Sequence, residues 1–93
     1  MSTFNQNFVP YYISGTTVAQ VSSHNGLLHS IVIGETAPGT ITVYDEGVGT
    51  GTTTIVAVLK ASIAEGTYLF DANISKGIRV VTAGGSKITV NYQ

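Results

Sequence analysis

Apolar and polar residues alternate in short segments along most of the chain, which is the pattern of β-strands that bury one face. The clearest segment is 39–45, where Ile41 and Val43 alternate with two threonines and a tyrosine. We expect the two aliphatic residues to point into a core and the other three to point outward, as in an antiparallel sheet with one face in water. Similar patterns predict further strands at 16–22, 26–34, 54–60, 66–71, 78–83 and 87–92.

The segment 26–34 is bounded by glycines and is the longest of these predicted strands. Strict alternation places His29 on the same face as Ile31 and Ile33, and it places Leu28 on the opposite face. No part of the chain repeats apolar residues at the helical spacing i, i+3, i+4, i+7 through more than one turn, so no helix is expected.

The predicted strands are short and follow one another roughly every 8 to 12 residues, with turn residues between them. This spacing predicts an all-β fold, a single antiparallel β-sandwich of jelly-roll type with seven or eight strands. A chain of 93 residues can bury one core and not two. We therefore expect one sandwich domain over residues 16–93.

Residues 1–15 differ in composition from the rest of the chain and predict an extended N-terminal arm. The arm is too polar to form a core of its own, yet it carries four aromatic residues: Phe4, Phe8, Tyr11 and Tyr12. Such rings need a partner surface on which to be buried. We expect them to contact a neighbouring subunit or another protein, and the alternative is that they pack back on the same domain.

Charged residues make up only 10% of the chain, where roughly 25% is usual, and the net charge is −1. The four basic residues are scattered and form no patch that could neutralise several phosphates, so neither nucleic acid nor a membrane is an expected partner. A surface with so few charges should instead tend to associate with other protein surfaces. The chain has no cysteine, which excludes disulfides and thiolate metal ligands.

The glycine-rich segment 46–53 contains Gly47, Gly49 and Gly51 and is the best candidate for a phosphate-binding loop. It lacks the third glycine of a dinucleotide-binding loop, because Thr52 stands at that position, and no helix pattern follows it. We expect an exposed hairpin loop here, and we expect no cofactor.

The two histidines are the best candidates for metal binding or acid–base chemistry. A zinc site would need His24, His29 and either Asp45 or Asp71 to converge, and the odd spacing of the histidines puts them on opposite faces of a continuous strand. We therefore expect His24 in an exposed turn, His29 on a sheet face and no metal site. No serine lies in a nucleophile-elbow pattern, so no catalytic residue is expected and the chain is interpreted as a non-enzyme.

Four segments of the chain resemble small virion proteins of tailed phages, the β-sandwich proteins that decorate or cement a capsid. The segments are GTITVYD at 39–45, GTYLFD at 66–71, SKGIRV at 75–80 and ITVNY at 88–92. The resemblance covers about residues 26–92 and leaves the arm unmatched. It implies a structural protein that forms a homo-oligomer, with a trimer expected, and that stabilises the shell of the major capsid protein, or binds another virion protein, through its arm and sandwich edges.

The resemblance also implies a location on the capsid surface after synthesis in the host cytoplasm. The first residues lack the basic and apolar regions of a signal peptide, which agrees with synthesis in a cytoplasm. Two alternatives stay open. One is a head–tail connector, tail or head-fibre base protein of such a phage; the other is a carbohydrate-binding adhesion module that uses the 46–53 loop and exposed tyrosines such as Tyr44.

Overall fold

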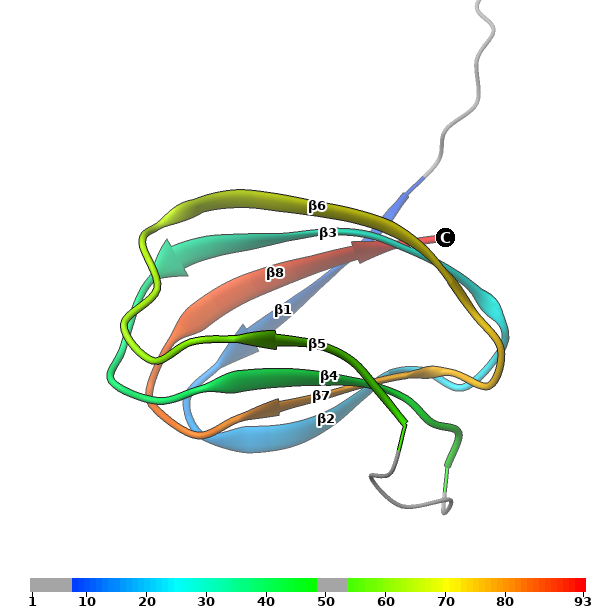
Figure 1. Ribbon diagram of the computed structural model, residues 1–93, viewed down its shortest axis with the longest axis horizontal. Coiled ribbons are helices and arrows are strands. Elements are labelled where there is room, and N and C mark those ends of the chain that lie inside the picture. The colour runs from blue at the N-terminus through cyan, green and yellow to red at the C-terminus, as the bar shows by residue number, and fades with distance from the viewer. Residues whose placement is uncertain (1–7, 49–53) are drawn as a thin grey trace, which may run out of the picture.

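Two four-stranded antiparallel sheets pack face to face in this protein, as the computed structural model shows for residues 8–48 and 54–93 (Figure 1). The strands are β1 (Val9–Ser14), β2 (Thr17–Ser22), β3 (Gly26–Glu35), β4 (Ile41–Asp45), β5 (Ile55–Leu59), β6 (Gly66–Ile74), β7 (Ile78–Thr82) and β8 (Lys87–Tyr92). Sheet A has the order β1-β8-β3-β6, and sheet B has the order β2-β7-β4-β5. The predicted all-β sandwich is confirmed, and the described residues contain no helix.

The strand order is that of a jelly roll. The pairs β1–β8, β2–β7, β3–β6 and β4–β5 nest inside one another, so the chain is one long antiparallel hairpin folded over into two sheets. The pairs β3–β8 and β4–β7 join neighbouring parts of that hairpin within each sheet. In Figure 1, sheet A lies above sheet B, with the core between them.

Aliphatic side chains from both sheets fill the space between the sheets. Ile41 and Val43 on β4 are buried, as their alternation predicts. Most of the other core residues are β-branched, which suits strand backbone. They are Ile13, Ala19, Val21, Leu28, Ile31, Ile33, Leu59, Ile74, Ile78, Val80, Ile88 and Val90, with Tyr68 and Phe70 packed partly against them.

His29 lies at an irregularity of β3 that changes which residues face the core. The register with β8 passes from Leu28–Tyr92 to Ser30–Asn91, so His29 is an extra residue on β3. Because of this bulge Leu28 is fully buried, whereas His29 is partly exposed on the outer face of sheet A. Strict alternation predicts that His29 lies on the same face as Ile31 and Ile33 and that Leu28 lies on the opposite face. Both expectations are wrong, because the alternation restarts at the bulge.

Residues 9–14 of the predicted arm form strand β1 and belong to the sandwich. β1 pairs along its whole length with β8, and Ile13 is buried in the core. Pro10 is tolerated because β1 is an edge strand of sheet A. The arm predicted over 1–15 therefore does not extend to residue 15, and Phe4 lies outside the described residues.

Candidate interaction surface

The outer face of sheet B carries two rows of side chains that cross all four strands. In the first row, Val18 on β2 pairs with Val81 on β7, which pairs with Thr42 on β4, and Thr42 pairs with Val58 on β5. All four alternate with residues of the core side and therefore point away from it. The row is a continuous stripe of β-branched side chains.

The second row runs beside the first and contains the single charged group of the two rows. It consists of Gln20 on β2, Arg79 on β7, Tyr44 on β4 and Ile55 on β5, in the same cross-strand order. The eight residues of both rows are called the sheet B face below.

Three of the eight residues of the sheet B face are exposed apolar side chains, and they lie on its two edge strands, β2 and β5. The exposed fractions are 63% for Val18, 58% for Ile55 and 56% for Val58. By contrast, the outer face of sheet A is interrupted by polar pairs, among them Lys87 with Glu35 at 2.9 Å. Exposed apolar side chains on one face of a sheet make that face a candidate surface for contact with another macromolecule.

Gln20 is held in a hydrogen-bond network at one end of the sheet B face. Its Nε2 donates to the carbonyl oxygens of Ser22 and Glu46, both at 2.8 Å. Its Oε1 accepts from Nε of Arg79 at 2.9 Å. The network thus fixes the guanidinium of Arg79, the one cation of this face, through a side-chain hydrogen bond.

The loop that follows β4 starts from the same network. Nη2 of Arg79 donates to the carbonyl oxygen of Gly47 at 2.7 Å, and the backbone N–H of Thr54 donates to Oε2 of the buried Glu46 at 2.8 Å. Gly47 is half-buried, so the expectation that it is exposed is wrong. Gly49 and Gly51 lie outside the described residues.

Asp45 fastens the β6–β7 turn to the end of β4. Its carboxylate accepts from the backbone N–H groups of Ser75 at 2.9 Å, Lys76 at 2.8 Å and Gly77 at 3.4 Å. Burial would raise the pKa of Asp45, but these hydrogen bonds and the charge of Lys76 outweigh it and hold the pKa below its ordinary value of 3.8. Asp45 is thus a structural carboxylate.

Replacing Asp45 with asparagine should weaken the fold near neutral pH and reduce its sensitivity to acid. We expect a loss of about 1–2 kcal/mol, because the amide NH2 group would face backbone N–H groups. A lowered pKa in the folded state means that the unfolded state binds more protons, so this stabilisation is present above the ordinary pKa and is lost as the pH falls through the folded one. Urea unfolding between pH 7 and pH 3 measures both effects.

The control for this substitution is Glu65→Gln, which changes an exposed carboxylate with a single backbone hydrogen bond, from Thr36. Its unfolding free energy should follow that of the unmodified protein across the pH range. Equal acid sensitivity of the Asp45→Asn variant and the unmodified protein would contradict the role assigned to Asp45.

His29, Asp71 and Phe8 form a cluster on the outer face of sheet A. Nδ1 of His29 lies 2.6 Å from Oδ1 of Asp71, and the ring of Phe8 stacks on the imidazole with centroids 4.0 Å apart and an angle of 9° between the planes. The aromatic residue Phe8 therefore packs on its own chain, which is the alternative considered for the arm.

The candidate metal ligands do not come together as a set. His29 meets Asp71, while His24 lies exposed in the turn after β2 and Asp45 caps the β6–β7 turn. Within residues 8–48 and 54–93, no three His, Asp or Glu side chains are placed to hold a metal ion. The same residues include no helix that is long and apolar enough to cross a membrane.

Tyr11 and Tyr12 lie on β1 and point in opposite directions. Tyr12 is 61% exposed, and Tyr11 is 37% exposed at the margin of the core. Their predicted contact with another chain stays a prediction. The sheet B face is not apparent from the sequence, because its rows join residues of four separate strands. The local signal is the apolar residues Val18, Ile55 and Val58 at outward-facing strand positions.

Comparison with known proteins leaves the chain without an assigned relative. No protein-family model, no curated protein and no solved structure matches it.

Proposed function

We propose that this protein is a non-enzymatic structural protein of a virus particle, which binds the outside of the capsid shell as a homo-oligomer, with a trimer expected. The observation that carries the proposal is the sheet B face, on which the apolar side chains of Val18, Ile55 and Val58 are more than half exposed. We assign this face to the contact with the shell protein.

The chemistry of the sheet B face supports a protein partner. Val18, Ile55 and Val58 offer apolar area without flexible side chains, so little conformational entropy is lost when they are covered. The strands beneath them are hydrogen-bonded into a sheet, so the surface is formed before the partner arrives. Its low charge excludes a contact based on phosphate recognition.

The fold supports the same role without deciding it. Jelly rolls of eight strands are common in viral capsid proteins and also in lectins. A fold alone does not define a function, and the surface that the fold presents distinguishes one jelly roll from another. The proposal of a capsid role in particular is drawn from the resemblance of segments 39–45, 66–71, 75–80 and 88–92 to capsid decoration proteins.

The test uses particles of the virus that carries the gene, prepared with the gene deleted, and purified protein added back. We expect the protein to bind such particles and to raise the temperature at which they release their genome. Val58→Asp places a charge on the β5 side of the contact, at one of its most exposed apolar positions, and should weaken binding at least about 30-fold. Binding is measured by co-sedimentation with the particles.

The matched control is Leu69→Asp. Leu69 is 67% exposed, compared with 56% for Val58, but it lies on β6, on the outer face of sheet A, so this variant should bind like the unmodified protein. Equal heat tolerance of particles with and without the protein, or equal binding of the Val58→Asp variant, would contradict the proposal. Binding to a glycan array that is lost in Tyr44→Ala would favour the adhesion module instead.

A further inference from the structure

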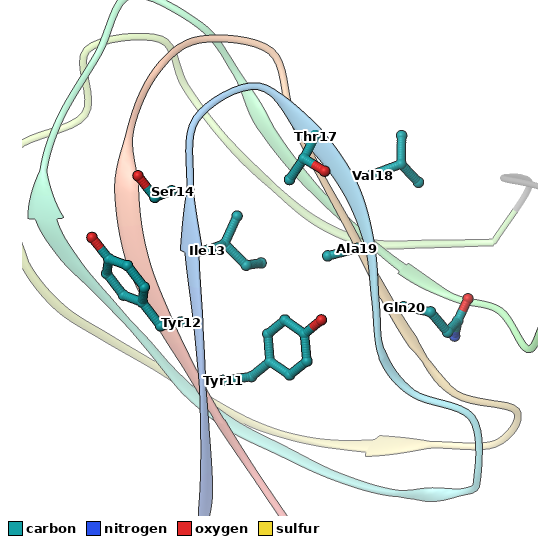
Figure 2. Close-up of a pocket in the computed structure, with 8 residues that line it drawn as sticks. All are labelled: Tyr11, Tyr12, Ile13, Ser14, Thr17, Val18, Ala19 and Gln20. Carbon is teal, nitrogen blue, oxygen red and sulfur yellow. The ribbon is translucent and has the colours of Figure 1, made fainter.

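A groove of about 470 Å³ lies between the edge strands β1 and β2, on one lateral side of the sandwich (Figure 2). Tyr11 points into the groove from β1, and Thr17 points into it from β2. Ile13 and Ala19 point the same way, but both are buried and belong to the core. Among the side chains that point into the groove, the ring of Tyr11, which is 37% exposed, and the half-buried Thr17 therefore remain accessible.

The backbone of β1 on the groove side has hydrogen-bonding groups without a strand partner in the described part of the chain. The N–H of Gly15 donates to the carbonyl oxygen of Ser86 at 3.1 Å, so the antiparallel ladder directs the backbone of odd-numbered residues of β1 toward β8. The N–H and C=O groups of Tyr12 and Ser14 are then directed outward. They can bind a ligand that lies along this edge.

The backbone of β2 offers the same kind of groups on the other side of the groove. The N–H of Glu46 donates to the carbonyl oxygen of Gly77 at 3.1 Å, which directs odd-numbered residues of β7 toward β4 and even-numbered ones, such as Val80, toward β2. On β2 the N–H and C=O groups of Val18 and Gln20 are then directed outward. Each side of the groove therefore presents both donors and acceptors.

Tyr11 has a counterpart at the other end of sheet A whose hydroxyl group is already bound. Tyr11 pairs with Val90 on β8, and Val90 pairs with Ile31 on β3. Ile31 pairs with Tyr68 on β6, so the two tyrosines end one cross-strand row. The hydroxyl of Tyr68 donates to the carbonyl oxygen of Ala64 at 2.6 Å. The hydroxyl of Tyr11 has no such partner among the described residues, which leaves it available to a ligand.

The groups around the groove favour a neutral ligand that carries several hydroxyl groups. The groove is lined by no charged residue, so a charged ligand would lose its hydration without gaining a counter-ion. A large apolar ligand would find little accessible apolar area, because Ile13 and Ala19 are buried. A hydroxyl group both donates and accepts, and can therefore pair with either kind of backbone group and with the hydroxyls of Tyr11 and Thr17.

We infer that the groove between β1 and β2 binds a neutral sugar unit. The apolar face of the sugar ring packs on the ring of Tyr11, and the sugar hydroxyls bond to Thr17 and to the outward backbone groups of both strands. The volume of about 470 Å³ lies within the range of small-molecule sites. An added peptide strand fits less well, because Pro10 on the same edge has no N–H.

The sugar site is separate from the surface assigned to the shell protein, and the inference does not rest on the proposed function. The sheet B face consists of side chains that point outward from sheet B, whereas Tyr11 and Thr17 point into the space between β1 and β2. The site also differs from that of the adhesion module considered above, which would use Tyr44.

A glycan array that carries neutral, sialylated and sulfated oligosaccharides tests the inference with the full-length protein. We expect binding to neutral glycans. Tyr11→Leu keeps an apolar side chain but removes the ring and its hydroxyl, and it should weaken this binding at least about tenfold. Thr17→Val removes one hydroxyl and should weaken it about threefold to tenfold. The matched controls are Tyr44→Leu on β4 and Thr67→Val on β6, which should bind like the unmodified protein.

Amide chemical shifts recorded during titration with the most strongly bound neutral glycan locate the site and show that each variant is folded. The N–H signals of Tyr12, Ser14, Val18 and Gln20 should shift, and those of β5 and β6 should not. Absence of binding to neutral glycans, binding confined to acidic glycans, or shifts confined to other strands would overturn the inference. So would neutral-glycan binding that Tyr11→Leu and Thr17→Val leave unchanged.

The same variants keep this inference distinguishable from the proposed function. Loss of glycan binding in Thr17→Val with particle binding preserved supports a separate sugar site. Glycan binding by a protein that does not bind the particles would count against the proposed function alone.

Discussion

Replacing Gly39 with alanine is expected to lower the free energy of unfolding by about 3 kcal/mol, near the upper end of what overpacking costs. Gly39 lies in the β3–β4 connection, where it touches the β7–β8 turn. A Cβ at this position would overlap the backbone nitrogen of Gly84 and lie 2.6 Å from the carbonyl carbon of Ala83. Both obstacles are backbone atoms, which cannot move aside as the end of a side chain can.

The loss should be large relative to the total stability of a small domain, which is about 5–15 kcal/mol. In a domain of this size, 1 kcal/mol shifts the melting temperature by about 4–8 °C, so the Gly39→Ala protein should melt more than about 10 °C lower. The matched control is Gly85→Ala in the neighbouring turn, where a Cβ meets no atom within 4 Å. Similar melting temperatures for the two variants would contradict the close approach of the two connections.

Leu28→Ala should destabilise the protein by about 3–4 kcal/mol, through lost burial and the cavity that remains. Leu28 is 0% exposed at the bulge of β3. The matched control is Leu69→Ala, where the same side chain is 67% exposed on β6 and its loss should change stability by no more than about 0.5 kcal/mol. Guanidinium unfolding of both variants measures the difference.

This comparison also tests the bulge itself. If β3 alternated without interruption, Leu28 would point away from the core and the two leucine substitutions would have similar effects. A loss of unfolding free energy below about 1 kcal/mol for Leu28→Ala would therefore contradict the assignment of Leu28 to the core face of β3.

The strands of this fold could be predicted because their patterns are local. The segment 39–45 shows its own alternation, and burial of Ile41 and Val43 follows from it without knowledge of the partner strands. Each of the seven predicted strand segments likewise has its own local pattern. Together these segments are sufficient to predict an all-β sandwich. Local pattern was less informative for residues 9–14, where Pro10 and the neighbouring tyrosines indicate an arm as readily as an edge strand.

The surface features depended on information that the sequence does not display. The bulge at His29 arises from the registers of β3 with β6 and β8, whose residues are distant in the chain. The rows of the sheet B face likewise exist only once four strands are aligned. The stacking of Phe8 on His29 joins a residue that precedes β1 to a strand two places away in sheet A. Register, rather than residue type, decides each of these.

The nested pairing of the jelly roll also orders the events of folding. Tyr44 pairs with Ile55 across a short connection, whereas Val9 pairs with Tyr92 from the far ends of the described chain. Closing a loop costs more entropy as the loop lengthens, so pairing begins most readily at β4–β5, and each pair that forms shortens the loop closed by the next. β1 is then the last strand to find its partner. The β1 edge of sheet A is therefore completed only when the other seven strands are in place.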